Sequence, residues 1–223
     1  MGLEAELAAA RSLDVSELAD SIEAIGFECT RCGACCKGHG EEHTATVFPD
    51  EIKGIQNGEY DWRDVARPMP FGLPEGDEGA ETFEWALRTD SCGDCTFYEE
   101  GTDDEAGVCT VYADRPLICR TYPFSVGNVD ERQRNEGDGL GATEPMGGVV
   151  EQEGLVRAHE CEGLGRDISR EDAEELAEAL KERAIRELEE AIGVRDNYEP
   201  TDVDGVVVHD SEGQKRPDGS PVE

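Results

Sequence analysis

The sequence predicts an α+β fold, in which a small irregular cysteine-rich domain is flanked by helices at the N- and C-terminal ends. Three observations lead to this prediction. Segments with helical periodicity lie near both ends of the 223-residue chain, few long periodic segments lie between them, and all nine cysteines fall in this middle region. We therefore expect four parts: an N-terminal helical segment at 1–26, a cysteine-cluster domain at 27–165, a C-terminal helix at 166–193 and an acidic disordered tail at 194–223.

The N-terminal segment predicts two helices, at 3–11 and 14–25. Asp14 can cap the second helix, with Glu17 three residues later as in a capping box. Gly26 is suited to end it. Its apolar residues recur at helical spacing: Val15, Leu18, Ala19, Ile22 and Ile25.

The middle of the chain predicts only short elements. The strand expected at 82–88 rests on Phe83, Trp85 and Leu87, which alternate with polar or small residues and so indicate a half-buried strand. Segments rich in Pro, Gly or polar residues predict loops. In order, we expect a short helix at 48–57, a loop at 66–81, the strand at 82–88, a second short strand at 107–112 and a long loop at 127–147.

A long helix is predicted near the C-terminal end. Ser169, with Asp172 three residues later, can cap it. Its apolar residues share one face: Leu176, Ala177, Leu180, Ala184, Leu188 and Ile192. From about residue 195 the sequence is polar and without a period, which predicts disorder.

The charge of the chain is extreme, with 54 acidic and 20 basic residues and a net charge of −34. The acidic residues are spread through the chain, which is typical of adaptation to a salt-rich cytoplasm, as in halophilic archaea. This acidity also disfavours nucleic-acid binding. The sequence has no apolar run long enough to span a membrane and no secretory signal, so we expect a cytoplasmic protein.

The cysteines are grouped in a pattern that is typical of metal-binding sites. Two intervening residues allow a tight turn to aim both thiolates at one centre, as in C-x2-C motifs. The first run is C-x2-C-x2-C with a fourth cysteine directly attached, and a second C-x2-C pair follows. The nine residues are Cys29, Cys32, Cys35, Cys36, Cys92, Cys95, Cys109, Cys119 and Cys161.

Two other interpretations of these cysteines are weaker. Buried core thiols would explain one or two, such as Cys161, but not six in C-x2-C register. Disulfides suit secreted proteins, and an odd count without a signal peptide argues against them. The sequence therefore predicts a domain built around a thiolate metal site. Because Cys36 can hardly face the same centre as Cys35, we expect a remote thiolate, from the segment 92–119, to complete it.

These motifs resemble the YkgJ-type cysteine-cluster family, a zinc- or iron-chelating domain, and the composition suggests a haloarchaeal-like member. The resemblance covers residues 27 to about 165 and includes the spacing Cys109-x-x-Tyr112-x-x-Arg115-Pro116-x-x-Cys119-Arg120-x-x-Pro123-Phe124. It implies eight ligands, namely every cysteine except Cys161, whose Cys-x-Gly setting is similar to a late cysteine of many members. One branch of the family resembles flagellin lysine N-methylase, which implies a protein lysine methyltransferase-like enzyme as the alternative function.

The identity of the metal stays open at this stage. The C-x2-C-x2-C run is typical of an iron–sulfur cluster, including the four-iron type, while paired C-x2-C motifs are typical of zinc. The triple run favours iron–sulfur. His39, His43 and His159 lie near cysteines but are more typical of solvated loop residues. The glycine-rich segment 137–141 lacks a preceding buried strand, so we interpret it as an ordinary loop and not as a cofactor site.

Overall fold

The chain divides into two compact units. The computed structural model describes residues 2–38, 43–70, 80–102, 106–127, 148–201 and 203–222. Unit 1 comprises Met1–Cys35 and Leu117–Leu188, and unit 2 comprises Cys36–Pro116 and Glu189–Glu223. The α+β class with flanking helices is confirmed, but the division cuts through the expected 27–165 domain and separates the adjacent residues Cys35 and Cys36.

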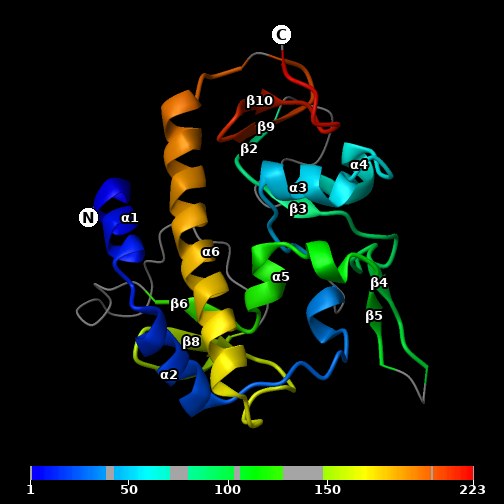
Figure 1. The fold of residues 1–223 in the computed structure, drawn as a ribbon. Coiled ribbons are helices and arrows are strands. Elements are labelled where there is room, and N and C mark those ends of the chain that lie inside the picture. The colour runs from blue at the N-terminus through cyan, green and yellow to red at the C-terminus, as the bar shows by residue number, and fades with distance from the viewer. Residues whose placement is uncertain are drawn as a thin grey trace. The chain divides into compact units, whose positions relative to one another are not determined.

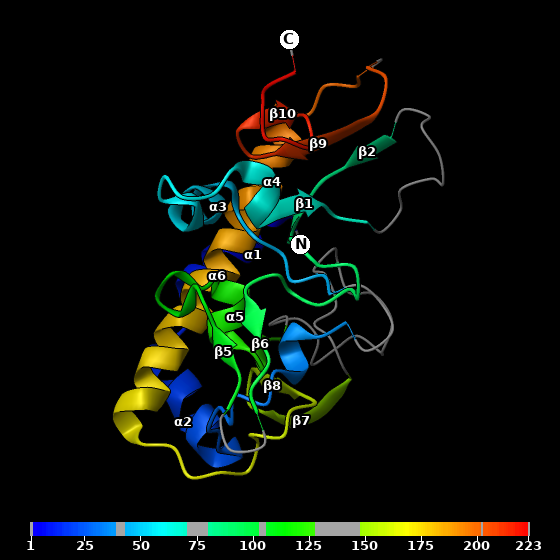
Figure 2. The same ribbon diagram turned by 90° about the vertical axis from the view of Figure 1, so that its right-hand side faces the viewer.

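Unit 1 combines helices with one small antiparallel sheet of strand order β6-β8-β7. The sheet and helix α2 are seen from two directions in Figures 1 and 2. The elements are α1 (Leu3–Arg11), α2 (Val15–Ile25), α5 (Leu117–Thr121), β6 (Phe124–Val126), β7 (Val149–Glu153), β8 (Val156–His159) and the first part of α6 (Arg170–Asn197). A 3-10 turn, η1 (Ala34–Cys36), lies at the boundary of the two units.

The predicted caps of these helices are present. The Asp14 side chain accepts hydrogen bonds from the backbone N–H groups of Ser16 and Glu17, at 2.8 and 3.2 Å. Ser169 Oγ accepts one from Asp172 N at 3.1 Å. Both caps satisfy backbone donors that have no partner inside the helix. The helices at 3–11 and 14–25 are therefore confirmed, and the C-terminal helix runs from Arg170 to Asn197.

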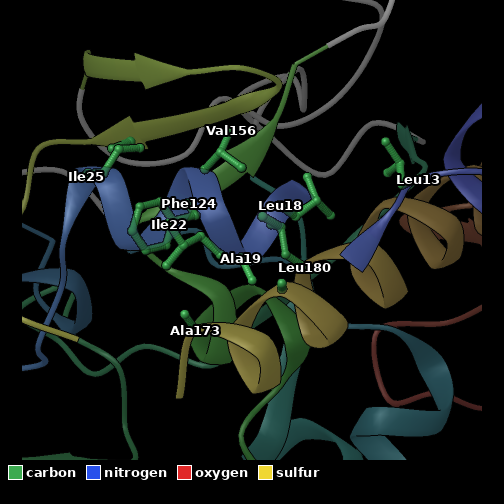
Figure 3. Packing of buried hydrophobic residues seen from close by; sticks show 11 residues of the cluster. Leu13, Leu18, Ala19, Ile22, Ile25, Phe124, Val156, Ala173 and Leu180 are labelled. Atoms are coloured by element: carbon green, nitrogen blue, oxygen red, sulfur yellow. The ribbon is translucent and has the colours of Figure 1, made fainter. Parts of the chain in front are cut away.

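The core of unit 1 lies where α2 meets the sheet and α6. Ile22 is fully buried, and Phe124 and Val156 of the sheet lie over it (Figure 3). Ala173 and Leu180 of α6 belong to the same buried cluster (Figure 3). Burial of each large aliphatic side chain contributes about 1.5–3 kcal/mol. The predicted apolar face of α2 is thus the surface that joins the sheet to α6.

The described residues of unit 2 form the short helices α3 and α4, the end of α6 and three small sheets. The elements are α3 (Pro49–Gln56), α4 (Trp62–Val65), β1 (Ala66–Pro68), β2 (Ala80–Thr82), β3 (Trp85–Leu87), β4 (Tyr98–Glu99), β5 (Val108–Cys109), a 3-10 turn η2 (Tyr112–Asp114), β9 (Val206–Asp210) and β10 (Gly213–Lys215). The sheets are β1-β3, β4-β5 and β10-β9-β2, in which β9 runs parallel to β2. The short helix predicted at 48–57 is confirmed as α3.

The expected disorder of the C-terminal tail, 194–223, is wrong. Residues 206–215 form the β9–β10 hairpin, and Val207 and Val208 are buried. Asp210 is buried. It accepts a hydrogen bond from Trp85 Nε1 at 2.9 Å and forms an ion pair with Lys215 at 2.7 Å. Three consecutive valines at 206–208 give this segment the β-propensity and apolar area that the polar residues around them obscure.

Two other expectations also need correction. The strand at 82–88 is shorter, with Trp85, Ala86 and Leu87 all buried and Phe83 47% exposed, so it does not have one solvated face. The loop at 66–81 contains β1 and the start of β2. Most of the loop at 127–147 lies outside the described residues. Among the helices that the structure describes, none has the length and apolar character needed to cross a bilayer.

Candidate metal centre

In unit 1, two segments far apart in the sequence pair just before the first cysteine run. Phe27 forms an antiparallel bridge with Leu164. Glu28 N donates to Gly163 O, and Gly165 N donates to Gly26 O, both at 3.0 Å. This pairing sets the chain that enters Cys29 beside the chain that leaves Cys161.

The close approach of these segments requires glycine. A Cβ at Gly163 would lie 2.3 Å from the carbonyl oxygen of Glu28, and a Cβ at Gly26 would lie 2.5 Å from that of Arg166. Real Cβ atoms do not approach backbone this closely, so a side chain at either position would push the segments apart. Gly26 also has φ +77°, which favours glycine.

The first cysteine run curls tightly after this pairing. Arg31 has φ +57° and Gly33 has φ +76°, both in the left-handed region, and η1 follows. Left-handed residues between right-handed ones turn successive N–H groups toward one side, an arrangement that suits negative groups. The run therefore presents Cys29, Cys32 and Cys35 from a compact loop.

The Cys161 thiol lies near the thiols of this run. Burial raises its pKa, a hydrogen bond from Gly163 N at 3.4 Å lowers it, and the nearby Cys35, Cys32 and Cys29 raise it further. Such electrostatic effects require groups within a short distance of one another. A bound cation would reverse this effect, because it favours the thiolate. Cys161 is thus the cysteine whose segment is paired with the start of the C-x2-C-x2-C run, whereas Cys92, Cys95 and Cys109 belong to unit 2.

Tyr122 is a residue of this site that sequence reasoning missed. Its hydroxyl donates to the carbonyl oxygen of Glu160, next to Cys161. Burial raises its pKa most, and Cys161, Cys35 and Cys32 add to the rise. The only signal in the sequence is its position just before Pro123, within the motif that follows Cys119. Tyr122 therefore holds the loop that carries Cys161.

The donor chemistry fits a metal that prefers sulfur. Four thiols gather in unit 1, and Gly163 N–H donates to one of the sulfurs, as occurs in iron–sulfur and zinc sites. Within the described ranges, no group of three or more His, Cys, Asp or Glu side chains stands at metal-ligand geometry as it is. The residues that would hold a metal at this place are Cys29, Cys32, Cys35 and Cys161.

The other five predicted ligands are divided between the two units. All nine cysteines are within the described residues and in the thiol state. Cys119 is half-buried on α5 of unit 1. Cys36, Cys92, Cys95 and Cys109 belong to unit 2.

Of the three histidines considered in the sequence, His43 and His159 are described, and both are buried, so the expectation that they are solvated is wrong. His159 Nε2 lies 2.8 Å from Ser125 Oγ, within hydrogen-bond distance. His43 is buried in unit 2. His39 and the glycine-rich segment 137–141 lie outside the described residues.

Fold and site together define an α+β cysteine-cluster protein with the donor chemistry of a metal-binding domain. The chain belongs to the CxxCxxCC family, whose description is "Putative zinc- or iron-chelating domain" and whose match covers residues 28–162. This range includes all nine cysteines. No curated protein and no solved structure matches the chain.

Proposed function

We propose that the protein binds an iron–sulfur cluster through Cys29, Cys32, Cys35 and Cys161 of unit 1. One observation carries the proposal: the backbone pairing of Phe27 with Leu164 and of Glu28 with Gly163 sets the segment of Cys161 beside the segment that enters the C-x2-C-x2-C run. Three closely spaced cysteines and one remote cysteine are the ligand pattern of ferredoxin-type four-iron clusters. The continuation typical of ferredoxins is absent from the sequence, so the likeness concerns the ligands and not the fold.

Zinc is the other metal that the family description allows, and the grouping of the ligands favours iron at this site. Structural zinc sites commonly pair two C-x2-C turns. Unit 1 instead has three cysteines in C-x2-C-x2-C spacing, and Cys161 is the single distant cysteine that would be the fourth ligand. A bound cluster would supply one-electron transfer. The chain itself holds the four sulfurs, donates a hydrogen bond from Gly163 N to Cys161, and fixes the loop that carries Cys161 through Tyr122.

The compartment follows from the same chemistry. Thiolate ligands need a reducing environment, so the cytoplasm is the proposed location. The lysine methyltransferase alternative gains no support from the family match, whose description concerns metal chelation alone.

The test is purification of the full chain without oxygen, in molar salt, followed by absorption spectroscopy and analysis of iron, sulfide and zinc. The proposal predicts broad visible absorption that bleaches on reduction, with about four iron and four sulfide ions per chain. A colourless protein that contains zinc and no sulfide would contradict it. The apoprotein reconstituted with iron and sulfide is the second sample, in case the cluster is lost during purification.

A further inference from the structure

Unit 2 has four cysteines that the proposed cluster does not use. They come from three segments: Cys36 ends η1, Cys92 and Cys95 flank a turn, and Cys109 lies on β5. Cys95 is buried, Cys36 and Cys109 are half-buried, and Cys92 is exposed. Backbone hydrogen bonds tie the three segments to one another.

The segment that follows Cys36 lies along the 92–95 turn. Cys95 N donates to Cys36 O at 2.8 Å, and Gly38 N donates to Asp94 Oδ1 at 2.9 Å. His43 N donates to Gly93 O, also at 2.8 Å. Because these bonds involve successive residues of the turn, they fix Cys36 beside Cys95.

The β4–β5 hairpin brings Cys109 to the same place. Tyr98 is the cross-strand partner of Cys109, and Tyr98 N donates to Cys95 O at 3.0 Å. Neighbouring strands lie about 5 Å apart. Cys109 is therefore about one strand spacing from the chain that leaves Cys95.

The turn that carries Cys92 and Cys95 is held by hydrogen bonds between the Asp90 side chain and backbone N–H groups of the turn. Asp90 Oδ1 accepts hydrogen bonds from Cys92 N at 2.7 Å and from Asp94 N at 3.1 Å. Gly93 has φ +86°, which favours glycine. The turn thus presents two thiols at the spacing that zinc sites use.

We propose that Cys36, Cys92, Cys95 and Cys109 form a second thiolate site, which binds Zn²⁺. It extends the proposed metal binding to unit 2 and does not depend on which metal unit 1 holds. Zinc suits this group because it takes four sulfurs from separate loops in a closed tetrahedral site, and unit 2 has no triple run. Within the described residues these four thiols, like those of unit 1, do not stand at metal-ligand geometry.

Local structure supports a zinc site here more than local charge does. Four thiolates around Zn²⁺ carry a net charge of about −2. Lys37, which follows Cys36, lies 5.7 Å from the ring centre of Tyr98, the cross-strand partner of Cys109, but it also pairs with Glu100 and so offsets little of this charge. The strands nearest the site, β4 and β5, have only two residues each, so a metal would add much of the local stability.

The experiment measures iron and zinc in the full chain, in Cys92→Ser and in Cys95→Ser, all purified without oxygen in molar salt. Zinc should fall by about one ion per chain in both variants, while the visible absorption and iron stay at the wild-type level. Cys92 is exposed, so Cys92→Ser keeps the test valid if Cys95→Ser fails to fold. Zinc content equal to that of the wild type in both variants would overturn the proposal.

Cysteine alkylation in the wild type provides a second readout. A zinc-selective chelator should expose Cys36, Cys92, Cys95 and Cys109 to alkylation together, as mapped by mass spectrometry, and leave the unit 1 cysteines protected. If the chelator exposed the cysteines of both units at once, the proposal that they form two separate sites would be overturned. If the wild type lacks iron, the proposed cluster fails, but the loss of one zinc in Cys92→Ser would still support the second site.

Discussion

The Cys161 thiol lies close enough to Cys35 to be affected by its charge, although the two residues are far apart in the sequence. Burial is the main cause of the raised pKa of Cys161, and Cys35 adds to it. The adjacent residue Cys36 belongs to the other unit. Cys161 and Cys35 therefore belong to one group of interacting thiols within unit 1.

Replacing Gly163 by Ala should disturb the site without removing a ligand. The new Cβ would lie 2.3 Å from the carbonyl oxygen of Glu28, so the segments that carry Cys29 and Cys161 must separate. We expect a loss of about 1–3 kcal/mol in the free energy of unfolding and a lower iron content. Gly148→Ala, also in unit 1, is the control, because nothing lies within 4 Å of its Cβ. Equal behaviour of the two variants would refute this explanation.

Replacing Lys215 by Met should destabilise unit 2. The Lys215 side chain is 9% exposed and pairs with Asp210, which is 1% exposed. Without Lys215 a buried carboxylate loses its counter-charge, which costs about 3–5 kcal/mol. Lys53→Met removes an exposed cation that also pairs with Glu212, and should cost less than about 1 kcal/mol. Denaturant unfolding measures both, and similar losses would show that burial is not the cause.

The effect of Glu212→Gln should depend on pH. Hydrogen bonds from Lys215, and then from Lys53, lower the pKa of Glu212 below its usual value of 4.5. A lowered pKa stabilises the folded state above the unfolded-state pKa, and this stabilisation disappears as the pH falls through the folded-state value. Glu212→Gln should therefore lose about 0.5–1 kcal/mol at neutral pH, and the difference should shrink below about pH 4. A difference that grows in acid would contradict this sign.

Stability should rise steeply with salt. The 54 acidic residues repel one another at low ionic strength, whereas in 1 M salt the screening length is about 3 Å. We expect a higher melting temperature in molar potassium chloride than in dilute buffer. The metal-free protein, unfolded in the same salt series, separates this effect from metal binding. A melting temperature that is independent of salt would argue against adaptation to a salt-rich cytoplasm.

Local signals predicted the helices well. The cap at Asp14 and the apolar spacing of α2 depend only on nearby residues, so they can be read from the sequence. The β9 strand was missed because its stability comes from pairing with β2, which is distant in the sequence. Val207 and Val208 carried the signal, but the polar residues around them led to the prediction of disorder.

The candidate site was predicted in its residue types but not in its grouping. C-x2-C spacing identifies thiols that a turn can present together, and says nothing about which distant cysteine joins them. The bridge between Phe27 and Leu164 brings Cys161 to the first run. The same long-range pairing explains why Cys161, the cysteine with the weakest support from spacing, lies beside the run.

The iron content of Cys161→Ser tests the central claim most directly. The chain should be purified without oxygen in molar salt, beside the wild type and Cys92→Ser, and compared by iron analysis and visible absorption. If Cys161 is a cluster ligand, Cys161→Ser should lose most of its iron and absorption, as Cys32→Ser should, while Cys92→Ser keeps both. Wild-type iron and absorption in a folded Cys161→Ser protein would contradict the account.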